Sequence, residues 1–118
     1  MKLQRGDMVL ARLPHASGIG GKRRPCVVIQ NDEDNRKIAN TVVVFITSAL
    51  SRRGDKSHVF IDVATMEGTR TGLMHDSLIS CNNIATVEKN LISSVIGALG
   101  PGTLPQMNDC LKAALELP

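Results

Sequence analysis

The chain has 118 residues, 42% of them apolar and 21% charged, which fits one folded domain and excludes a wholly disordered protein. No apolar run approaches the roughly 20 residues that a membrane-spanning helix requires, and Met1 to Val9 lacks the apolar core of a signal peptide, so we expect no membrane contact. Residues 1–60 hold eleven Lys and Arg against five Asp and Glu, whereas residues 61–118 hold three against six, and this basic first half favours an anionic partner.

The pattern of apolar and turn-forming residues predicts a series of short strands. The expected strands cover 7–13, 25–30, 41–47, 57–62, 77–81 and 84–87. Residues 14–24 form a glycine-rich loop, while 31–40 and 48–56 are polar, turn-rich connections. Residues 92–99 indicate a short helical turn followed by a strand.

The C-terminal segment predicts a helix over 103–117. Thr103 followed by Gln106 is typical of a capping box, with Thr103 as the N-cap. The apolar residues then recur at spacings of three and four. We therefore expect a mainly β fold: a small barrel with a C-terminal helix. Val42–Ile46 is apolar on both faces, so one face can fill the barrel and the other needs a cover, either the helix or a second subunit.

Register arithmetic brings two functional groups together. If strands 25–30 and 41–47 form a hairpin closed by a symmetric loop over 31–40, position 24 faces position 47. Arg24 and Thr47 would then lie with their Cβ atoms roughly 5 Å apart. A guanidinium, whose planar fork matches phosphate oxygens, would meet a hydroxyl at one rim of the barrel. Further basic residues come from the two adjoining loops: Lys22, Arg23, Arg52, Arg53 and Lys56.

The three cysteines favour a reducing compartment. Cys26, Cys81 and Cys110 are an odd, dispersed set with no CxxC spacing, which predicts buried free thiols in the cytoplasm. His58 and His75 lack metal-ligand spacing, so we expect no metal and no other cofactor. His75, Asp76 and Ser77 do not form a triad, because adjacent strand residues point to opposite faces.

Four segments of the chain resemble the MazF/PemK family of bacterial toxin–antitoxin toxins. They are Arg5-Gly-Asp-Met-Val-Leu10, Arg24-Pro-Cys-Val-Val-Ile-Gln-Asn-Asp32, Asn40-Thr-Val-Val-Val-Phe-Ile-Thr-Ser48 and Cys81-Asn-Asn-Ile-Ala-Thr-Val-Glu-Lys89. The resemblance runs nearly end to end. It implies one toxin domain over 1–118, with an SH3-like barrel of the MazF/PemK/CcdB type, that forms a homodimer.

The resemblance also implies an activity. Family members are endoribonucleases that cleave single-stranded mRNA without metal: the ribose 2′-hydroxyl attacks the adjacent phosphorus and leaves a 2′,3′-cyclic phosphate and a 5′-hydroxyl. The Arg of the Arg-Pro step and the Thr that ends the next strand serve the active site, and they match Arg24 and Thr47. A cognate antitoxin is implied as a second partner, and its acidic, partly disordered tail would compete with RNA for the basic groove.

The residue types suit these roles. Because the substrate supplies the nucleophile, the protein must stabilise an anionic phosphorus centre, which Arg24 and Thr47 can do as hydrogen-bond donors. His15, on the glycine-rich loop, has the chemistry of a proton carrier. The expected RNA contacts are Lys22, Arg23, Ser48, Arg52, Arg53, Lys56 and Asn82. With two Phe and no Tyr or Trp, RNA contact should rely on phosphates and hydrogen bonds more than on stacking.

Three departures from the family pattern keep alternatives open. Ile19 lies in a loop where many relatives are acidic, Asn82 stands where they often carry an acidic residue or Gln, and Ala85 replaces the usual Arg. Three alternatives therefore follow from the resemblance. The chain is expected to be an active endoribonuclease, an endoribonuclease of weak activity or altered specificity, or a decayed homologue that still dimerises and binds antitoxin. A further alternative is a non-enzymatic module on the same scaffold that binds a DNA gyrase subunit, which would not need Arg24 or Thr47.

Overall fold

The computed structural model describes residues 1–12 and 22–118; the predicted catalytic His15 and the departure at Ile19 lie outside the described residues. The elements in chain order are β1 (Asp7–Arg12), β2 (Arg23–Val28), α1 (Asp32–Lys37), β3 (Asn40–Thr47), β4 (His58–Ile61), α2 (Met66–Arg70), β5 (Ser77–Glu88), the 3-10 turn η1 (Lys89–Leu91), β6 (Ile92–Ala98) and α3 (Thr103–Leu115). No helix within these ranges is both long and apolar enough to cross a membrane.

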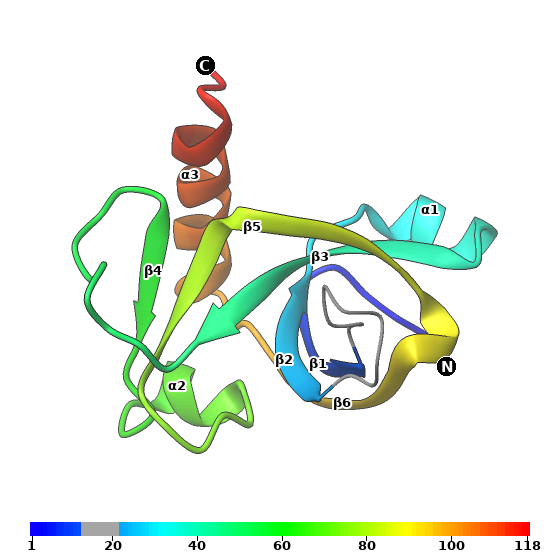
Figure 1. Ribbon diagram of the computed structural model, residues 1–118, viewed down its shortest axis with the longest axis horizontal. Coiled ribbons are helices and arrows are strands. Elements are labelled where there is room, and N and C mark those ends of the chain that lie inside the picture. The colour runs from blue at the N-terminus through cyan, green and yellow to red at the C-terminus, as the bar shows by residue number, and fades with distance from the viewer. Residues whose placement is uncertain (13–21) are drawn as a thin grey trace.

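The strands form one antiparallel sheet in the order β4-β5-β3-β2-β1-β6. The sheet curls strongly, and α3 lies against β5 and β4 on its outer side (Figure 1). The prediction of a mainly β, barrel-like fold with a C-terminal helix is therefore confirmed. The sheet is not closed, because β4 and β6 stand at its two edges in the part of the chain that the structure describes.

The two faces of β3 bury separate apolar clusters. Val43 packs with Val9, Cys26 and Val28 on one face. Val44 and Ile46 pack on the other face, in a cluster that includes Met107 of α3. A cluster within one chain, to which α3 contributes Met107, thus buries the second face of the Val42–Ile46 run. It also fixes the position of β3, whose last residue is Thr47.

The predicted register of β2 and β3 is confirmed. The Cα partners are Cys26 with Phe45, Val27 with Val44 and Val28 with Val43. These are the pairs that a symmetric loop over 31–40 predicts. The ladder ends at Cys26 and Phe45, so Arg24 and Thr47 each lie two residues beyond its last pair, toward the rim.

The prediction of a turn-rich connection over 31–40 is wrong, because α1 lies within it. Asn31 is the N-cap and accepts a hydrogen bond from the Asp34 backbone N–H. Acidic residues fill the first turn and basic residues the last, which complements the helix dipole. Buried Asn35 anchors the helix, since its Oδ1 accepts hydrogen bonds from Gln30 Nε2 and Thr41 Oγ1. Because hydrogen bonds hold α1 in place, its sequence lacks the apolar periodicity from which a helix is predicted.

The prediction of separate strands over 77–81 and 84–87 is also wrong. A single strand, β5, runs through both segments and changes register against β3. Val44 pairs with Ile84, but the next β3 residue, Phe45, pairs with Ser80. Cys81, Asn82 and Asn83 therefore form a bulge that has no partner in the β3 ladder. Bulges of this kind often re-aim side chains beside functional sites.

The start of α3 differs from the predicted capping box. Thr103 is the first helical residue and Gly102 is the N-cap, without a side-chain cap of its own. Glu67 of α2 supplies the missing acceptor: its Oε1 accepts from the backbone N–H groups of Gly102, at 2.6 Å, and Thr103, at 2.8 Å. A carboxylate placed there also complements the helix dipole. The helix ends at Leu115, two residues before the predicted end.

Replacing Glu67 with glutamine should lower the melting temperature at pH 7, because the charge at the start of α3 is lost. Desolvation raises the pKa of the Glu67 carboxyl, but hydrogen bonds from Gly102, Thr103 and Arg70 outweigh it and hold that pKa below its usual range. A depressed pKa gives stability that is present at neutral pH and lost as the pH falls through the folded-state value. Thermal melts by circular dichroism at pH 7 and in acid should thus show a gap from wild type that is present at pH 7 and closes in acid.

The matched control for this change is Glu88→Gln at the exposed end of β5. It should melt like wild type at both pH values. A Glu67→Gln gap that stayed constant with pH would contradict the electrostatic explanation of the cap.

Candidate active site

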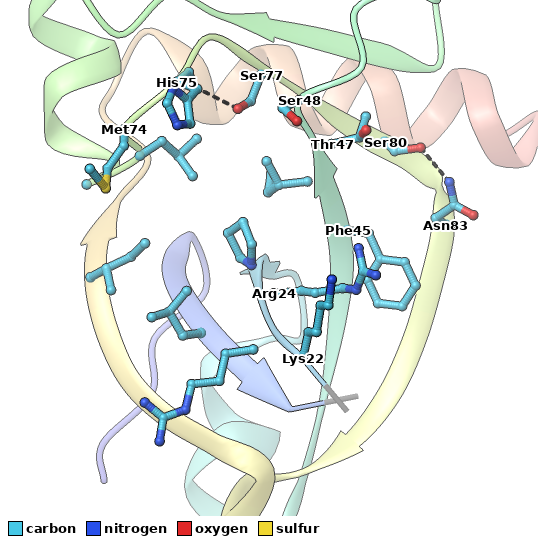
Figure 2. A pocket seen from close by; sticks show the side chains of 17 residues that line it. Lys22, Arg24, Phe45, Thr47, Ser48, Met74, His75, Ser77, Ser80 and Asn83 are labelled. Atoms are coloured by element: carbon cyan, nitrogen blue, oxygen red, sulfur yellow. Dashed lines mark hydrogen bonds between the residues drawn. The ribbon is translucent and has the colours of Figure 1, made fainter. Parts of the chain in front are cut away.

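A pocket of about 920 Å³ opens where β2 begins and β3 ends. Arg24 and Thr47 both line it, together with Lys22, Arg23 and Ser48. Figure 2 shows Lys22 and Arg24 entering from one side and Thr47 and Ser48 standing at the end of β3. The pocket therefore collects both predicted catalytic residues of the described chain and three of the predicted RNA contacts.

Arg24 is available to a ligand. Its side chain is exposed and is drawn toward the Phe45 ring in Figure 2. Among the ion pairs of the described residues, none involves Lys22, Arg23 or Arg24. Three adjacent cations without a carboxylate partner, at the mouth of a pocket, attract an anion such as a phosphodiester.

Among the described residues, none accepts a hydrogen bond from the Thr47 hydroxyl. Its Oγ1 accepts a hydrogen bond from the Ala49 backbone N–H at 3.1 Å. That contact uses a lone pair of the oxygen and leaves the O–H free to donate. It also fixes the hydroxyl at the end of β3, where the chain turns into the loop that follows. Thr47 is thus a positioned, half-buried hydrogen-bond donor that lines the same pocket as the exposed Arg24 guanidinium.

Four of the seven predicted RNA contacts do not line this pocket, and three of them, Arg52, Arg53 and Lys56, come from the loop after β3. Arg52 is paired with Asp55, with 2.7 Å between Nε and Oδ2. The Arg53 guanidinium stacks over Phe60, 3.6 Å from the ring centroid. Arg53 and Lys56 line a separate hollow of about 590 Å³ between the 48–57 loop, β4 and α3. Contact of these residues with RNA stays a prediction, and it requires RNA to extend beyond the first pocket.

The bulge in β5 brings Asn83 to the pocket. Asn83 lines it, whereas its predicted neighbour Asn82 does not. Asn83 Nδ2 donates to Ser80 Oγ at 2.6 Å, and Ser80 Oγ donates to Asn82 Oδ1 at 3.0 Å. His58 Nε2 lies 3.1 Å from the same Ser80 oxygen. The adjacent asparagines Asn82 and Asn83 are the sequence feature that points to this part of the site. Such a pair predicts the end of a strand, however, and not a bulge.

His75 is a pocket residue that the sequence did not single out for a role in the site. It lines the pocket near Ser77 and Ser48 (Figure 2), and its backbone carbonyl accepts a hydrogen bond from Ser77 Oγ at 2.7 Å. It belongs to the segment between α2 and β5, which reaches the rim only through the tertiary fold. An exposed imidazole in this position can exchange protons with a bound substrate.

The cysteines do not supply a nucleophile. Burial raises the pKa of Cys26 to about 12, against a smaller opposing effect of the Arg24 charge, and burial likewise raises the pKa of Cys81 to about 12. Both groups remain thiols at neutral pH and are poor nucleophiles in that form. All three cysteines are buried and free, as predicted. Among the described residues, no group of three His, Cys, Asp or Glu has the arrangement of a metal site.

Comparison with known proteins agrees with this fold. Residues 4–115 match the family described as PemK-like, MazF-like toxin of type II toxin-antitoxin system. Endoribonuclease EndoA of Bacillus subtilis is 31% identical over 99% of this chain and 97% of its own. Endoribonuclease MazF of Staphylococcus saprophyticus is 30% identical over 98% of this chain and 92% of its own. A mycobacterial endoribonuclease solved in complex with its cognate antitoxin has the same fold, with a TM-score of 0.79 and 24% identity over 98% of this chain and 97% of that chain.

Proposed function

Because the chain belongs to the PemK-like, MazF-like family of type II toxin–antitoxin toxins, we propose that it is an endoribonuclease that cleaves single-stranded RNA without a metal ion. The observation that carries the proposal is that one pocket is lined by both Arg24, an exposed guanidinium, and Thr47, a positioned hydroxyl. The full-length relatives EndoA and MazF, both named endoribonucleases, support the same activity.

The reaction proceeds by transfer of the phosphoryl group within the RNA. The ribose 2′-oxygen forms a bond to the adjacent phosphorus, and the bond from phosphorus to the 5′-oxygen of the next nucleotide breaks. The products are a 2′,3′-cyclic phosphate and a 5′-hydroxyl. Arg24 donates two N–H groups to the non-bridging oxygens as negative charge grows on them, and Thr47 donates its O–H. Lys22 and Arg23 hold the flanking phosphates.

The reaction also moves a proton from the 2′-hydroxyl and delivers one to the 5′-oxygen. Arg24 is a poor proton carrier because a guanidinium does not deprotonate in proteins. Two histidines have suitable chemistry. His15 is the residue that the sequence favours, and His75 adds an imidazole that lines the pocket.

The partners follow from the same chemistry. The substrate is cytoplasmic mRNA, and the second partner is a cognate antitoxin whose acidic tail competes for Lys22, Arg23 and Arg24. The solved relative bound to its cognate antitoxin supports this pairing. The active form is a homodimer of single toxin domains over 1–118.

The proposal is tested with a long single-stranded RNA and excess EDTA. The expected result is a discrete set of fragments that forms equally well with and without EDTA, while single-stranded DNA of the same sequence stays intact because it lacks the 2′-hydroxyl. Cleavage that requires magnesium, or cleavage of the DNA, would contradict the proposal. Intact RNA together with capture of a DNA gyrase subunit would support the non-enzymatic alternative instead.

A further inference from the structure

Two of the three cysteines lie together where α3 packs on the sheet. Cys81 lies in β5, where the bulge begins, and Cys110 lies in α3. Both belong to the apolar cluster that includes Met107 of α3, and their two thiols form a hydrogen bond with each other. Cys26 lies in the other apolar cluster, which holds no second cysteine. The fold therefore brings one pair of thiols together and leaves the third cysteine apart.

The contact between the two thiols follows from the geometry of the helix. Cys81 Sγ lies 4.0 Å from the backbone carbonyl oxygen of Met107. Met107 and Cys110 are three residues apart in α3, so their side chains share the face that packs on the sheet. Because the Cα–Cβ bonds of a helix tilt toward its N-terminus, the Cys110 thiol is directed back toward the turn that Cys81 contacts.

One short segment before β4 holds both cysteines in place. The backbone N–H of Cys81 donates to the carbonyl oxygen of Ser57 at 3.0 Å, and the Cys110 thiol donates to the carbonyl oxygen of Lys56 at 3.0 Å. Because Lys56 and Ser57 are adjacent, these two hydrogen bonds couple α3 to β5 through the same segment. Forming a disulfide would replace the hydrogen bond from Cys110 to Lys56 with a covalent link to Cys81.

Of the two thiols, Cys110 is the one that a small oxidant reaches. It is 7% exposed and lines the hollow of about 590 Å³ between the 48–57 loop, β4 and α3, whereas Cys81 is 0% exposed. Burial raises the pKa of both thiols, and their mutual hydrogen bond lowers the pKa of Cys110 but raises that of Cys81. Because the thiolate is the reactive form, Cys110 reacts first. Cys81 is a poor nucleophile by itself, but its position beside Cys110 gives it a high effective concentration.

We propose that Cys81 and Cys110 are a redox-active pair, which hydrogen peroxide oxidises to a disulfide that ties α3 to β5. The sulfur of Cys110 attacks one peroxide oxygen and the O–O bond breaks, which leaves a sulfenic acid on Cys110 and releases a water molecule with the thiol proton. The sulfur of Cys81 then attacks the Cys110 sulfur: an S–S bond forms, the S–O bond breaks, and a second water leaves with the Cys81 proton. Two electrons pass from the sulfur atoms to the peroxide.

The disulfide stabilises the fold because it restricts the unfolded chain. It closes a loop over 81–110, which contains the edge strand β6 and the first half of α3. A crosslink of this kind should lower the equilibrium constant for unfolding by about 30- to 900-fold. In a reducing compartment both thiols stay free, as they are in the structure, and an exchanging dithiol such as dithiothreitol restores them after oxidation.

The first experiment maps the crosslink. The full chain is treated with hydrogen peroxide, unfolded in an alkylating agent that blocks free thiols, and digested with trypsin without a reductant. Cleavage after basic residues leaves Cys81 on the peptide 71–89, Cys110 on the peptide 90–112, and Cys26 on a third peptide. Mass spectrometry should show 71–89 linked to 90–112, lighter by two hydrogen atoms than their sum, and Cys26 alkylated. Dithiothreitol should remove the linked species, and a non-reducing gel should show a monomer.

Three results of this map would overturn the proposal. One is alkylation of both Cys81 and Cys110 after peroxide treatment. Another is a sulfinic acid on Cys110 without any linked peptide, which would mean that Cys81 does not reach it. The third is a disulfide that involves Cys26 or joins two copies of the chain.

The second experiment measures the stabilisation by urea denaturation. The unfolding midpoint of wild type should rise after peroxide treatment and return after dithiothreitol. Cys110→Ala is the matched control, because it keeps every methionine that peroxide also oxidises but cannot form the disulfide; its midpoint should not rise. An equal rise in wild type and Cys110→Ala would overturn the proposal. If Cys110→Ala does not fold, the peptide map of wild type still decides, and since neither experiment involves RNA, the outcome is independent of the proposed ribonuclease function.

Discussion

Replacing Arg24 with alanine should lower kcat/KM for RNA cleavage by about 100- to 1,000-fold, the range seen when one donor to a developing oxyanion is removed. Arg24→Lys should recover only a small part of this loss. Lysine keeps the positive charge but offers a single ammonium in place of the planar fork that matches two phosphate oxygens. The measurement is initial-rate kinetics on a short fluorogenic RNA that contains the cleavage motif.

The Arg24 variants should fold like wild type. The side chain is exposed and takes part in none of the ion pairs of the described residues, so its removal changes little in the folded state. Arg36→Ala, on the exposed side of α1, is the matched control for the loss of one positive charge. Equal rates for Arg24→Ala and Arg36→Ala would show that Arg24 acts only through the general electrostatic attraction of RNA.

Replacing Met107 with alanine should reduce the free energy of unfolding by about 2–5 kcal/mol, the usual cost of truncating a fully buried methionine. Met107 is 0% exposed and joins α3 to the face of β3 that carries Val44 and Ile46. The loss is a large share of the roughly 5–15 kcal/mol that stabilises a typical domain. Urea denaturation followed by circular dichroism measures it.

Met66→Ala provides the matched control for this truncation. Met66 is 87% exposed, so the same chemical change should alter the unfolding free energy very little. A loss for Met107→Ala as small as that for Met66→Ala would mean that α3 is not an integral cover of the sheet. In that case the second face of β3 would need another partner.

The geometry of the central hairpin can be predicted from the sequence. Pro25 predicts the start of one strand, which in the structure begins two residues earlier at Arg23, and the run from Thr41 to Thr47 predicts the other. The helix in the connection does not disturb the register, because α1 ends close to where β3 begins and the connection stays symmetric. For this reason the amino-acid sequence alone is enough to place Arg24 and Thr47 at the same pocket. Their catalytic roles remain predictions that the kinetic experiments test.

The remainder of the pocket depends on contacts between distant segments. His75 reaches the rim from the segment before β5, where no periodic pattern distinguishes it. Ser80 meets His58 only because β4 and β5 pair, 22 residues apart in the chain. Glu67 caps α3 from 35 residues away, which no local capping motif reveals. Interactions of this kind follow from the completed fold, so local sequence patterns do not predict them.

The most direct test of the central claim is the chemistry of the cut ends. A single RNA oligonucleotide is digested in EDTA, and the masses of both fragments are measured. A guanidinium and a hydroxyl that assist attack by the neighbouring ribose predict a 2′,3′-cyclic phosphate on the upstream fragment and a 5′-hydroxyl on the downstream one. A 3′-hydroxyl paired with a 5′-phosphate would mean that water or a metal-bound nucleophile attacked the phosphorus, and the account would be wrong.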